Sequence, residues 1–249
     1  MLNLTTALIA STARGWRGSI TKPAPKQPEK PLELYEFEGC PFCRLTREVL
    51  TELDLDAMIY PCPRGGTRFR PEVERLGGKQ QFPYLVDPNT GVSMYESSDI
   101  NAYLYKTYGE RKVPAKAQGG SGALLGSQLA TAVRGLKGMK ARSSKLPEKP
   151  LELYSFESSP YSRPVRELLC ELEIPYLLRN FGKAHKADMG PPWVRNRWYP
   201  DAPIKSRNRK AMRERTGRSQ VPFLIDPNTG TEMFESADIR KYLLATYGG

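Results

Sequence analysis

Histidine, cysteine and long apolar runs are all scarce in this chain of 249 residues. The single histidine, His185, leaves little room for histidine-based catalysis or for a zinc site, so we expect no bound metal. Four cysteines are too few to build a secreted domain from disulfides, and the close pair Cys40 and Cys43 indicates thiol chemistry in a reducing compartment. No apolar run reaches the roughly 20 residues with which a helix crosses a bilayer. We therefore expect a cytoplasmic protein, or one of an organelle stroma or matrix if the source is eukaryotic.

Acidic residues are in the minority, because 38 lysines and arginines face 27 aspartates and glutamates, for a formal net charge of +11. The segment 179–218 alone holds twelve basic and three acidic residues, which favours an anionic partner. Four aromatic residues lie among these bases: Phe181, Trp193, Trp198 and Tyr199. Bases and aromatics together suit a nucleic-acid surface, but no nucleic-acid motif frames them. We favour a solvated helix face with a loop that packs its tryptophans, or a docking surface for an acidic protein.

The chain contains an internal repeat, which determines how the rest is interpreted. Residues 29–55 return as residues 148–174 with 16 identities in 27 positions, and residues 81–109 return as residues 220–248 with 18 identities in 29. The offset between the copies grows from 119 to 139, so the second copy holds 20 additional residues inside the basic segment. The repeat predicts two tandem domains.

The repeat also extends upstream of each domain. The segment that begins at Ala7 shares with the segment that begins at Ser127 a pattern of Ala, Arg-Gly, a large apolar residue, a base and Gly. Residues 1–21 lack acidic side chains and resemble an organelle transit peptide, but an internal copy cannot be a cleaved presequence. We predict that a short amphipathic helix precedes each domain and packs on it, with a membrane-surface role as the alternative. Its apolar stripe in the second copy would be Leu125, Leu129, Val133 and Leu136.

Four segments follow from this reading. We expect a helix and linker over 1–28, the first domain over 29–110, a linker and second helix over 111–147, and the second domain over 148–249. In the first domain the periodicity predicts strands at 32–37, 56–60, 84–87 and 92–95, and helices at 41–53, 70–76 and 97–108. Ser97 is expected to cap the last helix. The order is βαβ, then α, then ββα.

The sequence EGCPFCR at residues 38–44 follows the first predicted strand and opens the first predicted helix. Backbone amides and the positive end of the helix dipole stabilise a thiolate at Cys40, so we expect its pKa to fall below that of a free thiol. Cys43 lies one turn further on and would resolve a mixed disulfide on Cys40. Pro83 precedes the third strand, where proline is unusual, and a cis bond would leave the backbone of Phe82 free to bind an extended peptide-like ligand.

These motifs carry a family resemblance. Each domain resembles a glutaredoxin and, equally, the N-terminal domain of glutathione S-transferases, over residues 31–109 and 150–248. CPFC is close to the CPYC of dithiol glutaredoxins, and Glu96-Ser97, followed by Asp99-Ile100 and Tyr103-Leu104, is similar to the transferase ESxAI segment. The resemblance implies an α/β fold of two tandem thioredoxin-like domains, with glutathione as co-substrate.

The same resemblance implies how the first domain would hold glutathione. Glu96 and Ser97 would bind its γ-glutamyl group, and Phe82 and Pro83 would pair with its cysteinyl backbone. The glycine carboxylate would meet a basic side chain at a position where family members differ: Arg68, Arg70 or Lys79.

The second domain departs from this pattern at its thiols. Ser159 and Ser162 stand in place of Cys40 and Cys43, which excludes dithiol exchange there. The expected ligand cradle persists as Val221, Pro222, Glu235 and Ser236. A serine at position 159 would lower the pKa of a bound glutathione thiol, as in a transferase. We favour the alternative that this domain is degenerate and structural.

The remaining cysteines are interpreted as structural, with metal binding or a third redox role as the alternative for Cys62. Cys62, in Pro-Cys-Pro, has no histidine or cysteine near it in sequence, and Cys170 lies in an apolar helical run. An iron-sulfur cluster held by Cys40, Cys43 and glutathione is disfavoured by the proline between them, and a zinc site would need two more ligands.

Three functions fit the sequence. The preferred one is a glutathione-linked thiol-disulfide oxidoreductase, in which Cys40 attacks disulfide or glutathionylated substrates and glutathione or Cys43 releases the product. The alternatives are a scaffold that presents glutathione or a client, and transfer of glutathione to an electrophile by Cys40 or Ser159. Transfer is disfavoured because the chain ends with the second domain, whereas transferases carry an all-helical domain that forms the electrophile pocket. The preferred function requires that the Cys40 sulfur reach solvent.

Overall fold

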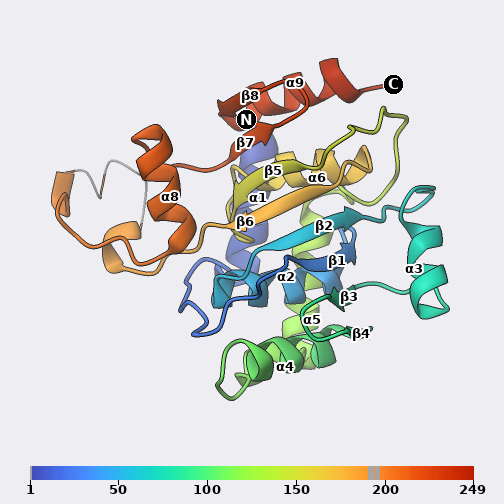
Figure 1. Ribbon diagram of the computed structural model, residues 1–249, viewed down its shortest axis with the longest axis horizontal. Helices are drawn as coiled ribbons and strands as arrows, with labels where there is room; N and C mark the ends of the chain where they lie inside the picture. The colour runs from blue at the N-terminus through green and yellow to red at the C-terminus, as the bar shows by residue number, and fades with distance from the viewer. Residues whose placement is uncertain (1, 190–193, 195–196) are drawn as a thin grey trace.

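Two copies of one α/β unit share a single sheet (Figure 1). The computed structural model describes residues 2–189, 194 and 197–249. Unit one, residues 29–110, contains β1 Leu32–Glu36, α2 Pro41–Leu53, β2 Ala57–Pro61, α3 Arg70–Gly77, β3 Tyr84–Asp87, β4 Val92–Met94 and α4 Ser97–Thr107. Unit two, residues 148–249, contains β5 Leu151–Ser155, α6 Arg163–Glu171, β6 Tyr176–Asn180, η2 Lys186–Asp188, α8 Arg207–Thr216, β7 Phe223–Asp226, β8 Thr231–Phe234 and α9 Ser236–Tyr247. The predicted element order and the α/β class are therefore confirmed in both units.

The sheet has eight strands in the order β4-β3-β1-β2-β6-β5-β7-β8. Strands β2 and β6 join the units as an antiparallel pair, in register from Ala57 opposite Leu178 to Ile59 opposite Tyr176. This pairing satisfies the backbone groups of two strands that would otherwise be exposed sheet edges. Figure 1 shows the resulting pseudo-twofold arrangement, with α4 and α9 at opposite ends and α3 and α8 on opposite sides.

The apolar core is continuous across the two units. One buried cluster contains Leu34 and Val49 of unit one together with Leu153 and Val165 of unit two. These side chains come from β1, β5 and the first helix of each unit, which share one face of the sheet. The units thus fold around a common core rather than as two independent bodies.

The helices that lead into the units form as predicted, but they are exchanged between the units. They are α1 (Leu2–Ala13) and α5 (Ser121–Val133), the latter preceded by the short η1 (Ala115–Ala117). Helix α5 packs against α2 of unit one, and α1 packs against α5 and α6. Ser127 Oγ donates to the Pro41 carbonyl, and Ser11 Oγ donates to the Ser158 carbonyl at 2.8 Å. The prediction that each helix packs on its own domain is wrong.

The predicted apolar stripe of α5 faces solvent. Leu125 and Leu129 are 58% and 53% exposed, whereas Ser127, Ala130 and Thr131 are buried. Small side chains allow the backbones of packed helices to approach closely, so here they form the inner face. The predicted helix forms, but the prediction that its apolar stripe faces inward is wrong.

Buried charges also connect the units. Four arginines from α2 and α6 surround two glutamates, and each of these side chains is almost fully buried: Arg44, Arg47, Arg163, Arg166, Glu38 and Glu157, which we call the ionic cluster. Arg166 Nη2 lies 2.9 Å from a Glu38 carboxylate oxygen of the other unit, and Arg47 Nε lies 2.8 Å from Glu157. Each unit therefore neutralises a buried carboxylate of the other.

Over the described ranges, no helix is long and apolar enough to cross a membrane. Trp193, one of the aromatic residues in the basic segment, lies outside the residues that the structure describes. Trp198 is 65% exposed, so a loop that packs this tryptophan away from solvent is not what forms.

Candidate functional site

The predicted thiol pair lies at the start of α2. Cys40 is the N-cap residue in extended conformation, and its Sγ accepts a hydrogen bond from the Cys43 N–H at 3.3 Å. Pro41 follows as the first helical residue, where its missing N–H costs nothing. The local sequence therefore positions the sulfur at the positive end of the helix, as predicted.

The two thiols have opposite electrostatic surroundings. Burial acts to raise the pKa of Cys40, but hydrogen bonds from Cys43 and from the Phe42 and Cys43 amides, together with the charge of Arg47, bring that pKa below its ordinary value. Burial and the hydrogen bond to Cys40 raise the pKa of Cys43 well above its ordinary value. If either thiol ionises, it is Cys40 that does so first.

The Cys40 thiol is closed off from solvent, contrary to what exchange chemistry requires. The residue is 3% exposed. The chain after α5 crosses the loop before it, where the Gly39 N–H donates to the Gly138 carbonyl at 3.1 Å. A Cβ at position 39 would clash with the Met139 side chain, so glycine allows this close approach. The exchanged helix and its following turn thus cover the predicted nucleophile.

Both expected peptide-binding bends are present. The Phe82-Pro83 and Val221-Pro222 bonds are cis. In unit one the Phe82 ring packs edge-on against Phe37, with centroids 6.0 Å apart, and lies beneath the Arg70 guanidinium at 4.8 Å. Phe82 thereby occupies space beside its own bend, and Val221 is the smaller residue at the equivalent position.

The Glu-Ser pairs take the same form in both units. Glu96 and Glu235 have φ values of 67° and 68°, and each carboxylate accepts a hydrogen bond from a glutamine side chain, Gln81 and Gln220 respectively. The left-handed glutamate, rather than Ser97, is the residue that precedes helix α4, so the predicted cap is displaced by one residue. Ser97 and Ser236 are the first residues of their helices.

Arg68 is not placed for ligand binding. Its guanidinium donates to the Leu172 carbonyl at 2.8 Å and to Ser144, and therefore joins unit one to the segment around unit two. Arg70 donates to the Pro63 carbonyl at 2.7 Å, and Lys79 lies over the Tyr95 ring. The segment that contains Ser144 lies against Arg68 in the complete chain. The sequence of one domain alone does not predict this contact.

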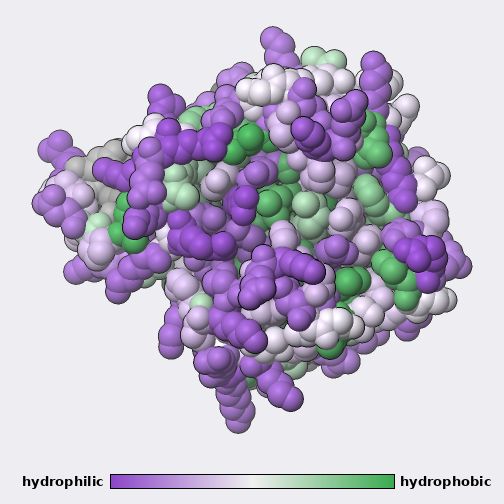
Figure 2. All heavy atoms as spheres, in the orientation of Figure 1, coloured by the Kyte–Doolittle hydropathy of each residue, from purple (hydrophilic) through white to green (hydrophobic). Residues whose placement is uncertain are grey.

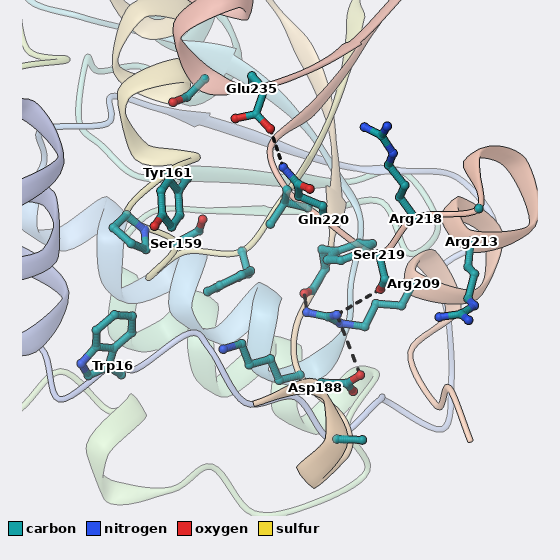
Figure 3. Close-up of a pocket in the computed structure, with 18 of the residues that line it drawn as sticks. Trp16, Ser159, Tyr161, Asp188, Arg209, Arg213, Arg218, Ser219, Gln220 and Glu235 are labelled. Atoms are coloured by element: carbon teal, nitrogen blue, oxygen red, sulfur yellow. Dashed lines mark hydrogen bonds and ion pairs between the residues drawn. The ribbon is translucent and has the colours of Figure 1, made fainter. Parts of the chain in front are cut away.

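A cavity of about 560 Å³ opens in unit two (Figure 3). Its lining includes Ser159 and three of the four residues predicted as the second cradle, Val221, Glu235 and Ser236, but not Pro222. Cavities of roughly 300–1,000 Å³ accommodate small ligands. The structure therefore provides a ligand-sized space in the unit that we interpreted as degenerate.

Ser159 lies at the cavity wall. Its Oγ accepts hydrogen bonds from the Ser162 N–H at 3.2 Å and from the Ser162 hydroxyl at 3.0 Å. The residue is 1% exposed, yet it lines the cavity. Because both bonds are accepted, the Ser159 hydroxyl proton remains free to donate to a bound group.

One end of the cavity is cationic. Figure 3 shows Arg209, Arg213 and Arg218 together on the side away from Trp16 and Tyr161. Arg209 donates to the Gly182 carbonyl at 2.8 Å and lies over the Phe181 ring, which fixes its position. Hydrophilic side chains cover the projecting region around α8, as Figure 2 shows. Asp188 also lines the cavity and lies 3.9 Å from an Arg209 nitrogen, but the three arginines outnumber it, so this end favours carboxylates or other anions.

The other end of the cavity is apolar and includes residues that the sequence analysis did not select. Leu8 and Trp16 come from the leading segment of unit one, and Pro160 and Tyr161 come from unit two. The repeat of Arg-Gly plus a large apolar residue marked Trp16 as part of a motif. Its place at this cavity depends on the helix exchange, for which the sequence carries no signal.

The other cysteines are buried as predicted. Burial raises the pKa of both Cys62 and Cys170, and Cys170 Sγ donates to the Gly138 carbonyl at 3.3 Å. Among the described residues there is no group of three or more histidine, cysteine, aspartate or glutamate side chains that would hold a metal.

Comparison with known proteins assigns the family. The model of the glutathione S-transferase N-terminal domain matches residues 34–112 and 153–249, more than half of the chain, and the chain therefore belongs to that family. Among solved structures, a Bombyx mori glutathione transferase is 28% identical over 34% of this chain and 39% of that chain, with a TM-score of 0.29. A delta-class glutathione transferase from Nilaparvata lugens is 29% identical over 32% of this chain and 38% of that chain, with a TM-score of 0.27. The chain thus spans well under two thirds of either transferase, and no curated protein matches it at a significant level.

Proposed function

We propose that this protein binds glutathione in the unit-two cavity and transfers it to electrophiles, in the manner of a glutathione transferase. The observation that carries the proposal is the cavity of about 560 Å³, in which Ser159, Val221, Glu235 and Ser236 converge beside a cationic wall. Membership of the glutathione S-transferase N-terminal domain family supports glutathione as the ligand.

Each end of glutathione has complementary groups. The Glu235 carboxylate would bind the ammonium of the γ-glutamyl group, and the start of α9 at Ser236 would bind its carboxylate through backbone amides. The glycine carboxylate would lie at the arginine end. These three contacts would set the thiol between them, on the side of Ser159.

Ser159 would then act on the thiol. A hydroxyl that donates to the sulfur stabilises the thiolate and lowers the pKa of the bound thiol. The thiol proton leaves to solvent, the sulfur forms a bond to the electrophilic carbon, and the leaving group departs with the pair of electrons from the bond that breaks. Ser159→Ala should lower the rate with a chlorodinitrobenzene-type substrate by about 10-fold to 100-fold.

Calorimetric titration with glutathione tests the binding step. Glu235→Gln should weaken binding about tenfold, because a charge-assisted contact is lost. The matched variant Glu96→Gln changes the equivalent residue of unit one and should leave the affinity unchanged. Equal affinity of the Glu235→Gln variant and the unaltered protein would refute glutathione binding at this cavity.

Thiol-disulfide exchange at Cys40 is the second candidate function. It is favoured by the lowered pKa of Cys40 and by the Cys43 amide at 3.3 Å from its Sγ. Because Cys40 is only 3% exposed, the turn that covers it would have to open before a substrate could reach the sulfur. The Cys40 thiolate would attack a glutathionylated sulfur, forming one S–S bond while glutathione leaves as a thiolate, and a second thiol would reduce the new disulfide. Reduction of hydroxyethyl disulfide should then be lost in Cys40→Ser, and unchanged turnover in that variant would exclude this function. Binding of glutathione with neither activity would indicate a scaffold.

A further inference from the structure

The apolar end of the unit-two cavity is built by the other unit. Leu8 belongs to α1, and Trp16 follows it in the leading segment of unit one, yet both line the cavity with Tyr161 of unit two. Figure 3 shows Trp16 and Tyr161 on one side of the cavity and the arginines on the other. The cavity is therefore amphipathic along its length, with a hydrocarbon end and a cationic end.

The backbone holds Trp16 in place through several contacts. Gly15 and Trp16 are both left-handed, with φ values of 57° and 55°, a conformation that bulky residues rarely adopt. The Trp16 N–H donates to the Ser11 carbonyl at 2.9 Å, and Ser158 Oγ donates to the Trp16 carbonyl at 3.3 Å. Its side chain nevertheless stays 40% exposed. A fixed backbone thus presents a large aromatic side chain that packing has not covered.

The chain after Trp16 is tied to unit two. The Lys183 N–H donates to the Ser19 carbonyl at 2.7 Å, and the Thr21 N–H donates to the Lys183 carbonyl at 3.0 Å. Lys183, itself a lining residue, is thereby clamped beside the leading segment. The wall that contains Trp16 is continuous with the cradle.

The segment that leads into unit two supplies an internal comparison for Trp16. Gly135 and Leu136 repeat the left-handed pair, with φ values of 61° and 60°. Both copies therefore share this backbone conformation, and they differ in the side chain of the residue that follows the glycine. The aromatic residue is presented at the unit that has the cavity.

We propose that the leading segment of unit one forms the second-substrate site of unit two, and that Trp16 selects electrophiles with a planar aromatic group. This inference rests on the proposed function, since the glycine carboxylate of the tripeptide would occupy the cationic end. The indole of Trp16 would stack on the aromatic group while Leu8 and Tyr161 cover its edges. The substrate class is an aromatic electrophile without charge on its ring, and the product is its S-conjugate of glutathione.

Binding of S-substituted glutathiones tests this inference. S-(4-nitrobenzyl)glutathione should bind about tenfold more tightly than S-methylglutathione, which has the same tripeptide and no ring. Trp16→Ala should remove most of this preference and keep the affinity for S-methylglutathione. Trp16→Phe should keep most of the preference, because a smaller ring still stacks. The matched variant Leu136→Ala should behave as the unaltered protein.

A spectroscopic measurement separates contact from a structural role. S-(4-nitrobenzyl)glutathione should quench tryptophan fluorescence in the unaltered protein and in Leu136→Ala, and the quenching should be lost in Trp16→Phe. An undiminished preference in Trp16→Ala would overturn the inference and leave glutathione binding intact. If neither glutathione nor any conjugate binds the unaltered protein, the proposed function fails and the inference fails with it.

Discussion

Unit one and unit two share one fold and differ in what they leave accessible. Unit one keeps the cysteine pair, but Cys40 is 3% exposed beneath the turn that follows α5. Unit two has serines in place of both thiols and opens a cavity of about 560 Å³. The units differ at equivalent positions, among them Phe82 against Val221, Glu74 against Arg213, and Leu136 against Trp16. Unit two also holds the 20 additional residues of the basic segment, and Ala187 and Asp188 from that segment line its cavity. The presence of a reactive motif and the presence of a ligand-sized cavity are therefore separate properties of a repeated domain.

The largest expected effect concerns the ionic cluster, to which the two units contribute equivalent residues with unequal contacts. Glu157 contacts all four arginines, so Glu157→Gln leaves them without their main counter-charge. We expect the free energy of unfolding to fall by about 3–5 kcal/mol, because an uncompensated buried charge is costly. Chemical denaturation measures this. Glu38→Gln, which removes the equivalent carboxylate with fewer contacts, should cost less, and the reverse order would contradict this account.

The same cluster predicts a dependence on pH. Burial acts to raise the pKa of Glu157, but Arg166, Arg47, Arg163 and Arg44 lower it far below the ordinary 4.5. A carboxyl group with a lowered folded pKa adds stability above 4.5, and this stability is lost as the pH falls toward the folded pKa. As the pH falls from about 5 to about 3, the free energy of unfolding should decrease more in the unaltered protein than in Glu157→Gln.

Replacing one side chain should make the unit-two cavity resemble the equivalent region of unit one. Val221→Phe introduces the residue that unit one carries beside its bend, and the ring would project into the cavity. We expect the affinity for glutathione to fall by at least about tenfold, since the ring displaces ligand volume. Calorimetry measures the affinity. The reciprocal variant Phe82→Val serves as the control for general destabilisation and should retain binding in unit two.

A smaller effect is expected at the covered thiol of unit one. Met139→Ala should speed alkylation of Cys40 by iodoacetamide about threefold to tenfold, because a side chain packed at the Gly39 turn is removed. Mass mapping should find Cys40 labelled before Cys43, whose pKa is raised. The rate should rise with pH to a midpoint below the ordinary cysteine value of 9.0. A midpoint above that value would remove the basis for exchange chemistry at Cys40.

The smallest effect is expected on the outer face of α5. Leu129 is 53% exposed, so Leu129→Ala should change the free energy of unfolding by less than about 0.5 kcal/mol. Ala130 is fully buried, and Ala130→Leu should cost about 1–3 kcal/mol through overpacking. Thermal unfolding of the two variants compares them. A larger cost at Leu129 would mean that the predicted stripe, and not the small-residue face, packs inward.

Local sequence was sufficient for much of unit one. The helix 41–53 was predicted with its observed bounds, because Pro41 marks its first turn and Asp54 ends it in left-handed conformation. The strand 84–87 also has its predicted bounds, and the other predicted elements end within two residues of their predictions. These features depend on residues a few positions apart, so short-range patterns suffice to predict them.

The amino-acid sequence by itself determined the repeat, the α/β element order and the helix-start position of Cys40. Only the tertiary structure decided that α1 and α5 exchange units, that Cys40 is covered, and that the open cavity lies in unit two with Trp16 in its wall. The physical reason is that burial depends on which distant surfaces meet. Ser127 contacts Pro41 and Ser11 contacts Ser158 across more than eighty residues of chain, and no local periodicity encodes such a pairing.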